Sequence, residues 1–174
     1  MADGRVLYAH RGKVHVLRYV GDIRYPLAPT IDSFVDQLFR REPVTELVID
    51  LSETDSIDST NLGELARIAN RLRAGGGARP VIVCRRSDID CVLRSMAMDE
   101  VFDLTAEGTD DGVDARPLDA SPVRNSNALR QLMLDAHRAL MDMSPENRER
   151  FFDVVALMES RDAQRDVEQS PRVR

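Results

Sequence analysis

The chain has 174 residues, 43% of them hydrophobic and 31% charged, and a formal net charge of −6, which suits one domain of ordinary size plus an appendage. It contains no run of about 18 apolar residues and no basic-then-apolar N-terminal segment, so we expect no membrane span and no signal peptide. Two cysteines and no basic patch argue against a disulfide framework and against direct nucleic-acid binding, and we expect a cytoplasmic protein that acts through other proteins.

The first predicted elements are a β-hairpin and a helix. Apolar-rich runs at 5–10 and 13–20 flank Arg11-Gly12, a pattern typical of two antiparallel strands. A loop with two prolines follows, and Thr30 can then cap a helix that ends before Pro43. The apolar face of this helix would hold Ile31, Phe34, Val35 and Leu38.

Further strands and helices alternate along the chain. The run at 46–51 is short, apolar and rich in β-branched residues, which predicts a strand buried on both faces. Apolar residues then recur at helical spacing from Leu62 to Leu72, which predicts an amphipathic helix ending at Gly75-Gly-Gly77. The outer face of that helix would carry Glu64, Arg67 and Arg71. The series is completed by a strand at 80–84, a helix at 88–96 capped by Ser87, and a strand at 101–104.

This order of elements predicts an α/β fold for residues 1–105. Parallel strands need helical crossovers, so the alternation implies a mixed β-sheet with helices packed on one face. We assign residues 106–123 to an acidic linker, because six acids and one base between 103 and 119 leave a net charge of −5 there. A calcium loop at 110–114 is the alternative, but the ligand spacing and the closing glutamate of an EF-hand are missing.

The C-terminal part predicts a helical hairpin, which we assign to residues 124–160. Apolar stripes at 129–140 and 151–158 mark its two helices, and Ser144-Pro145-Glu146 marks the start of the second. So small a hairpin cannot bury its own apolar faces, and we expect it to pack on the sheet domain, on another copy or on a partner. The charged residues 161–174 predict a disordered tail.

Asp58-Ser-Thr60, at the predicted junction of a strand and a helix, has the clearest functional meaning. A hydroxyl there lies beside free backbone N–H groups and the positive end of a helix dipole, where a phosphate is tolerated. The same residue types are favoured helix caps, so a plain capping role is the alternative.

The stretch Asp58-Ser-Thr-Asn-Leu-Gly-Glu-Leu65, behind an apolar strand, resembles the STAS domain of anti-sigma factor antagonists. Family members typically carry Asp-Ser-[Ser/Thr]-Gly-Leu-Gly here, and an anti-sigma kinase phosphorylates the serine after the aspartate. The resemblance covers roughly residues 4–105 and implies a STAS-like mixed sheet, followed in this chain by the C-terminal α-hairpin. It implies phosphorylation of Ser59, with Thr60 as a secondary candidate. Asn61 stands where the family usually has glycine.

The resemblance also implies a function and partners. It indicates an anti-sigma factor antagonist that binds an anti-sigma factor/serine kinase while Ser59 is unphosphorylated, that is restored by a phosphatase, and that can form a homodimer. The segment Gly21-Asp-Ile-Arg24 stands where members often have Gly-Glu-Leu-Asp, so an arginine replaces an acid. The implied partner-binding residues are Asp58, Thr60, Asn61, Gly63, Glu64, Arg67 and Arg24.

Several alternatives to this function stay open. A STAS protein can also be a scaffold or subunit of a stressosome-like assembly or of a lipid-transport ATPase, or can regulate another signalling partner. A small enzyme or nucleotide-binding domain is a further alternative. The histidines at 10, 15 and 137 lack metal-like spacing, and the first two are better interpreted as strand residues. We therefore expect no enzyme activity, no cofactor and no metal site.

Overall fold

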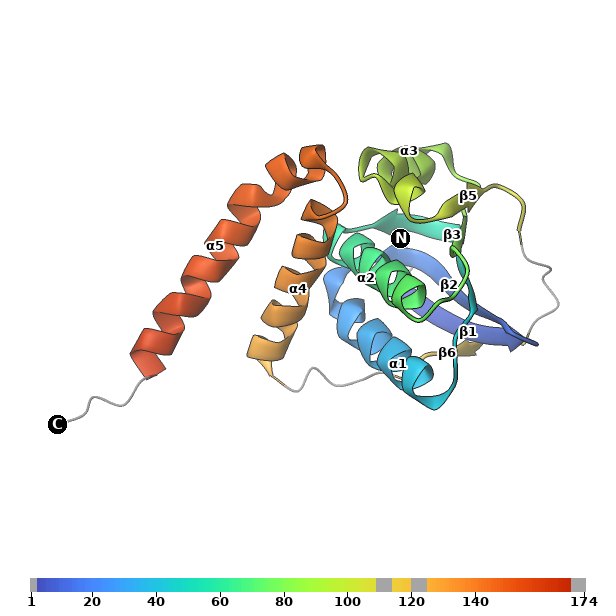
Figure 1. Ribbon diagram of the computed structural model, residues 1–174, viewed down its shortest axis with the longest axis horizontal. Helices are drawn as coiled ribbons and strands as arrows, with labels where there is room; N and C mark the ends of the chain where they lie inside the picture. The colour runs from blue at the N-terminus through green and yellow to red at the C-terminus, as the bar shows by residue number, and fades with distance from the viewer. Residues whose placement is uncertain (1–2, 109–113, 120–124, 170–174) are drawn as a thin grey trace.

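A computed structural model describes residues 3–108, 114–119 and 125–169 of the chain. Its strands form one sheet in the order β5-β4-β3-β2-β1-β6 (Figure 1). The strands are β1 (Arg5–Arg11), β2 (Val14–Ile23), β3 (Glu46–Ile57), β4 (Val81–Val83), β5 (Asp103–Thr105) and β6 (Arg116–Pro117). The α-helices are α1 (Ala28–Arg41), α2 (Ser59–Ala74), α3 (Ser87–Ser95), α4 (Ser126–Met141) and α5 (Pro145–Gln169), and the 3₁₀ turns are η1 (Tyr25–Leu27) and η2 (Met98–Glu100).

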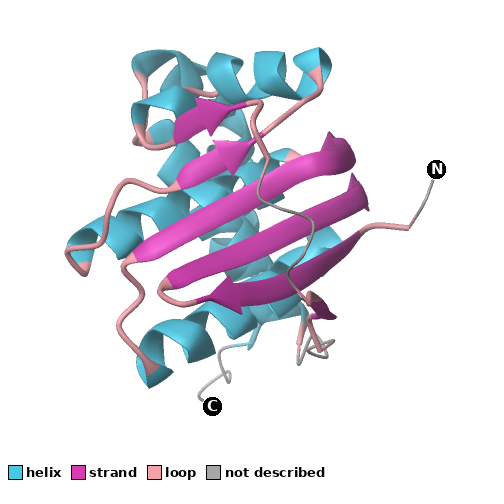
Figure 2. Ribbon diagram, turned by 90° about the vertical axis from the view of Figure 1, so that its right-hand side faces the viewer, coloured by secondary structure: helices cyan, strands magenta, loops and turns pink. Residues whose placement is uncertain are grey.

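The sheet is mixed, as the order of elements predicted. β1 and β2 pair antiparallel around the turn after Arg11, and β6 pairs antiparallel with the other edge of β1. The pairs β2–β3, β3–β4 and β4–β5 are parallel, and α1, α2 and α3 supply the three crossovers between them. Because all three crossovers run on the same side, the helices cover one face of the sheet (Figure 2).

The hydrophobic core lies between the sheet and these helices. Alternate residues of β2 and β3 point inward, so Leu17 and Ile49 are fully buried, and α2 places Leu65 and Leu72 against them. Burial of each such side chain stabilises the fold by about 1.5–3 kcal/mol. The layer fixes where β3 ends and α2 begins, which is where the candidate site lies.

Some element ends differ from the sequence predictions. α1 begins at Ala28, ahead of Thr30, because a proline in its first turn has a backbone already suited to a helix start. Ser87 is the first residue of α3 and not its cap, a position that Arg86 takes without a side-chain hydrogen bond. β3 continues to Ile57 because it stays paired with β2 beyond the apolar run. The last strand of the domain begins at Asp103 and not at 101, after the turn η2.

The linker and the tail also contain structure that the sequence analysis did not predict. β6 lies within the linker at 116–117 and pairs with Leu7 and Tyr8 of β1. α5 runs to Gln169, so residues 161–169, which we assigned to a disordered tail, continue the helix. In the part of the chain that the structure describes, no helix has the length and apolar character needed to cross a membrane.

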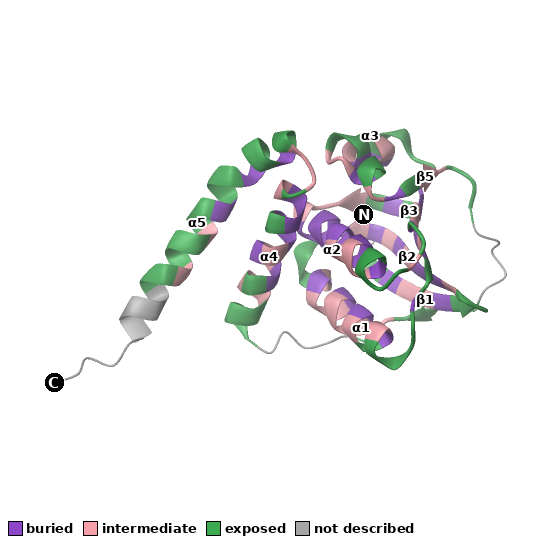
Figure 3. Ribbon diagram, viewed as in Figure 1, coloured by how far each residue is buried: buried purple, intermediate pink, exposed green. Residues whose placement is uncertain are grey.

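The C-terminal hairpin packs on its own domain, with α4 beside α2 and α5 on the outer side of α4 (Figure 1). The two helices are antiparallel, and ion pairs Arg138–Glu159 (2.7 Å) and Arg130–Asp162 (3.1 Å) join them. Figure 3 shows α5 largely exposed along its outer side, whereas α4 alternates buried and exposed residues. The sequence left three docking surfaces open for the hairpin, and in the structure the hairpin docks on its own sheet domain.

Candidate functional site

Asp58 holds the junction between β3 and α2 in place. It is the N-cap of α2, and its Oδ1 accepts hydrogen bonds from the backbone N–H of Asn61 (3.0 Å) and from the Asn61 side-chain amide (2.9 Å). Its Oδ2 accepts from the backbone N–H of Tyr25 at 2.5 Å. The loop that contains Arg24 and Tyr25 therefore borders the start of α2.

Ser59 follows as the first residue of α2 and is half-buried. The capping role belongs to Asp58, so the Ser59 hydroxyl is available for a different contact. Its Oγ lies 3.0 Å from Nε2 of His137, which α4 contributes. Two segments far apart in the sequence thus meet at the hydroxyl that the motif singled out.

The hydrogen bonds of His137 define which of its ring nitrogens carries the proton. Nδ1 lies 2.6 Å from the carbonyl oxygen of Met133, and a carbonyl can only accept, so Nδ1 donates. In the neutral ring, Nε2 is then an acceptor, and the Ser59 hydroxyl donates to it. His137 is buried, and the ring of Phe151 packs edge-on against it with centroids 5.4 Å apart. Sequence reasoning considered His137 only as a metal ligand and missed this contact.

Gly63 is the position of closest approach between α2 and α4. A Cβ atom built on Gly63 would lie 2.2 Å from the carbonyl oxygen of Ala136, which is far inside van der Waals contact. The glycine of the Leu-Gly motif is therefore required here for helix packing. Thr60 and Asn61, in the preceding turn, are also buried.

Glu64 is buried, so its predicted place on the outer face of the helix is wrong, because α2 packs against both α1 and α4; Arg67 and Arg71 of the same predicted face stay half-buried. Arg67 donates to Glu64 at 2.6 Å and lies 3.3 Å from Asp32. Burial raises the pKa of Glu64 to about 7; the ion pair with Arg67 partly offsets this, and the charges of Asp32 and Asp135 add to it. Arg67 itself stays about one-third exposed and can reach a second molecule.

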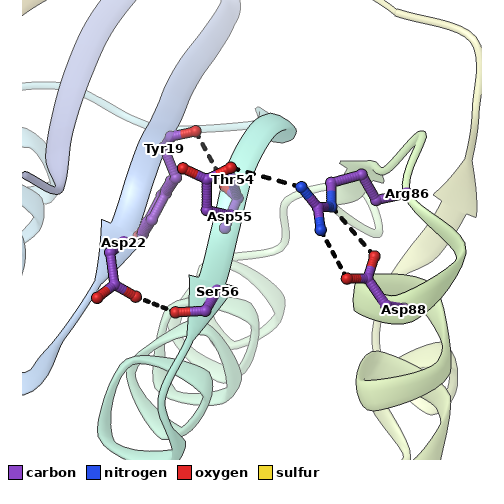
Figure 4. A network of polar contacts seen from close by, with 7 residues as sticks. All are labelled: Tyr19, Asp22, Thr54, Asp55, Ser56, Arg86 and Asp88. Carbon is purple, nitrogen blue, oxygen red and sulfur yellow. Dashed lines mark hydrogen bonds and ion pairs between the residues drawn. The ribbon is translucent and has the colours of Figure 1, made fainter. Parts of the chain in front are cut away.

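Figure 4 shows a polar network on the strand that leads to Ser59. Thr54 donates to the backbone carbonyl of Tyr19 (2.9 Å), and Ser56 donates to Asp22. On the other side, Arg86 lies between Asp55 (3.4 Å) and Asp88 (2.7 Å), and its hydrogen bond lowers the pKa of Asp88 to about 2. β2 on one side and the start of α3 on the other thus hold the acidic segment before Ser59.

Arg24 and Asp58 stand on the exposed rim of this site. The Arg24 side chain is half exposed and pairs with Asp22 at 2.9 Å, which raises the pKa of the guanidinium. The residues predicted for partner binding therefore form two groups. Arg24 is exposed and Arg67 is half-buried, whereas Thr60, Asn61, Gly63 and Glu64 are buried; of these four, Gly63 meets the backbone of α4 directly.

The other polar residues that the sequence singled out have structural partners. Buried Asp50 pairs with Arg18 at 3.0 Å, and His15 accepts or donates a hydrogen bond with Tyr8 at 2.8 Å within the β-hairpin. Among the described residues, no group of three or more His, Cys, Asp or Glu side chains is arranged to hold a metal ion. The calcium-loop alternative at 110–114 falls outside the described residues except for Asp114.

Comparisons with known proteins agree with this architecture. A protein-family model described as "STAS domain" matches residues 5–111. The NMR structure of the protein TM1081 is similar at a TM-score of 0.52 and 21% identity, over 56% of this chain and 78% of that one. A crystal structure described as Mglu aligns at a TM-score of 0.36 and 22% identity, over 47% of this chain and 19% of that one, which is too low to carry an argument. No curated protein matches the chain. The matched region contains all the parallel strand pairs of the sheet and the Ser59 junction, so the chain belongs to the STAS domain family.

Proposed function

We propose that this STAS protein is a phosphorylation-switched protein-binding regulator, an anti-sigma factor antagonist that is not an enzyme and acts in the cytoplasm. The observation that carries the proposal is the division of roles between neighbours. Asp58 caps α2, so the Ser59 hydroxyl at the helix start is not needed to hold the junction together. A phosphate can then be added at the positive end of the helix dipole without loss of the Asp58 N-cap.

Charge explains how such a modification would change binding. Phosphorylation adds about −1.5 to −2 charges at pH 7. The added charge would lie on the residue next to Asp58, whose carboxylate already caps the same helix. An unpaired charge trapped in an interface costs about 3–5 kcal/mol, and each 1.4 kcal/mol is about tenfold in affinity, so modification would act as a switch.

The accessible residues indicate which part of a partner would bind. Arg24 lies beside the start of α2 and Arg67 lies about two turns into the helix, and both guanidinium groups are partly exposed. An anti-sigma factor/serine kinase with acidic side chains around its docking surface would pair with them. A phosphatase would return Ser59 to its binding state.

The proposal is tested by locating the phosphate and by comparing matched variants in binding. Phosphopeptide mass spectrometry from cells should find phosphate on Ser59. Pull-downs with an anti-sigma factor should retain Ser59→Ala and lose Ser59→Asp. Ser87→Asp is the control. Ser87, like Ser59, is the first residue of a helix, but it is exposed and belongs to α3. Phosphate found only elsewhere, or equal binding by the two Ser59 variants, would contradict the proposal.

A further inference from the structure

The C-terminal hairpin covers the face of α2 that begins at Ser59. Three contacts define the covered face: Ser59 donates to His137, Gly63 meets the backbone of Ala136, and Glu64 is buried near Asp135. The hairpin lies outside residues 5–111, the part of the chain that matches the STAS family model. The α2 face of the matched domain is thus closed by a segment that the matched domain does not contain.

The docked hairpin blocks chemistry at the Ser59 hydroxyl. Phosphoryl transfer from a nucleoside triphosphate forms a bond from phosphorus to Oγ, breaks the bond to the leaving nucleoside diphosphate, and moves the hydroxyl proton to a base of the kinase. With α4 in place, that proton is directed to Nε2 of His137, and the imidazole stands 3.0 Å from Oγ. Ser59 is half-buried with the imidazole against its hydroxyl, so docked α4 obstructs the approach of the phosphorus and the kinase base.

The phosphorylated residue could not fit under the hairpin either. Nδ1 of His137 is committed to the Met133 carbonyl, so the nitrogen that faces Ser59 presents a lone pair. Only a doubly protonated ring could donate to a phosphate oxygen, and the tetrahedral phosphate would still need the space that the ring fills 3.0 Å from Oγ. α4 and α2 are in backbone contact at Ala136 and Gly63 one turn further along, so room for the phosphate requires α4 to move away from α2.

We propose that the α4–α5 hairpin is an intramolecular cap on the Ser59 face of α2, and that docking of this cap and phosphorylation of Ser59 exclude each other. His137 is the residue of the cap that senses the state of Ser59. The inference rests on the proposed function for its biological meaning, because it names the regulation of the same site. The partner of that function must likewise displace the cap to reach Gly63, which lies against the backbone of Ala136.

The first arm of the test places a negative charge at position 59 of the full chain and measures amide hydrogen exchange. Ser59→Asp should speed exchange across α4 by about tenfold or more, while β1, β2 and β3 stay protected. Ser87→Asp is the matched control, since it adds the same charge to the first residue of a helix that does not begin under the hairpin. This control should leave exchange in α4 as in the unmodified chain.

The second arm opens the cap from the other side and measures access to position 59. In a Ser59→Cys and Cys91→Ser background, the introduced thiol is alkylated with iodoacetamide; the remaining Cys84 is buried. Ala136→Arg drives a large side chain between α4 and α2, whereas Ala163→Arg adds the same side chain to an exposed position of α5. Alkylation at position 59 should be about tenfold faster with Ala136→Arg than with Ala163→Arg.

Two results would overturn the cap. One is unchanged α4 exchange in Ser59→Asp together with equal alkylation rates in the two alanine variants. The other is exchange that rises equally in the sheet, since the hairpin would then be an inseparable part of the core. Neither arm uses a kinase or a partner, so failure of the cap is distinct from failure of the proposed function. Absence of phosphate on Ser59 in cells would refute the function and leave release of the hairpin measurable.

Discussion

Gly63 lies where α2 and α4 come closest, and the absence of a side chain there allows the approach. Its neighbour Glu64 is buried by the same contact, with Arg67 as its ion-pair partner. Gly63 thus permits the close packing of the two helices, and Glu64 carries a buried carboxyl group beside it.

Replacement of Gly63 by alanine should destabilise the protein by about 1–3 kcal/mol, because the added methyl group forces α4 away from α2. Helix propensity alone predicts the opposite sign, since alanine in a helix is favoured over glycine by about 0.5–1 kcal/mol. Gly75→Ala is the control, because the nearest atom to its added Cβ lies 3.5 Å away. Urea denaturation measures both, and a stabilised Gly63→Ala would contradict the packing.

Glu64 should make stability depend on pH. Its pKa rises from 4.5 in the unfolded chain to about 7 in the fold, so the folded state binds more protons between these values. The free energy of unfolding should therefore fall as pH rises from about 4.5 to about 7, by up to roughly 3 kcal/mol. Glu64→Gln should flatten this part of the profile, whereas Glu149→Gln on the exposed side of α5 should not. Identical profiles for the two variants would show that Glu64 is not the group responsible.

At the scale of elements, the hairpin is attached at two places. α4 lies on α2, and the start of α5 contacts the end of α3, where the Asn147 side chain donates to the carbonyl of Met96 at 2.9 Å. The backbone N–H of Asn147 also donates to the Ser144 hydroxyl at 3.1 Å, which confirms the predicted cap of the second helix. The turn of the hairpin is therefore fixed by polar contacts.

Asn147→Ala should lower the free energy of unfolding by about 1–2 kcal/mol, because it removes a hydrogen bond of a buried side chain and leaves the Met96 carbonyl without that donor. Asn127→Ala is the control within the same hairpin, at an exposed position near the start of α4. Its effect should stay within about 0.5 kcal/mol. Thermal denaturation of the two variants side by side decides the matter, and equal losses would contradict the attachment.

The elements show where sequence reasoning succeeds. Apolar runs locate β1 to β4, and apolar residues at helical spacing locate α1, α2, α4 and the start of α5, because each of these elements buries apolar side chains in a common core. Asp58 and Gly63 were found through a short motif whose members are local in sequence. The start of α1 was misplaced because several residue types can begin a helix, and Pro29 outweighs Thr30.

The contact between Ser59 and His137 could not be predicted, because the two residues are 78 positions apart and no periodicity states which helix packs on which. Glu64 was predicted on an outer face for the same reason, since the sequence does not show which helices pack against α2. β6 was missed since two residues carry no strand pattern of their own and depend on the edge of β1. These errors share a cause, which is that they depend on contacts between elements.

At the scale of the whole molecule, the sheet domain and the hairpin share a core without being equivalent parts of it. Ala139, Leu140 and Phe151 of the hairpin join the main hydrophobic cluster. The family-matched region nevertheless ends before α4 and contains the parallel strands with their three crossovers. The domain can therefore be expected to fold without the hairpin at a reduced stability.

A chain that ends at Asp119 should fold with its sheet intact and with a lower melting temperature. Loss of the buried Leu140 and Phe151 contacts removes apolar burial worth about 1.5–3 kcal/mol per side chain. The newly exposed α2 face should also favour self-association. Calorimetry and light scattering measure the two effects, with the full chain as reference. An unchanged melting temperature, with a particle mass in solution still that of a monomer, would show that the hairpin does not contribute to the core.

Because β6 pairs with β1, a hairpin released from α2 stays close to it and competes there with a binding partner. β6, with Leu118 donating to the carbonyl of Val6 at 3.0 Å, anchors the chain at the sheet edge shortly before α4 begins. The tether to a released hairpin is therefore short, and short tethers give effective local concentrations of about millimolar. A partner present at about 1 μM would need to bind the α2 face roughly a thousandfold more tightly than the hairpin does to occupy half of the molecules. A weak, non-specific binder therefore cannot displace the hairpin, which stays tethered to the domain.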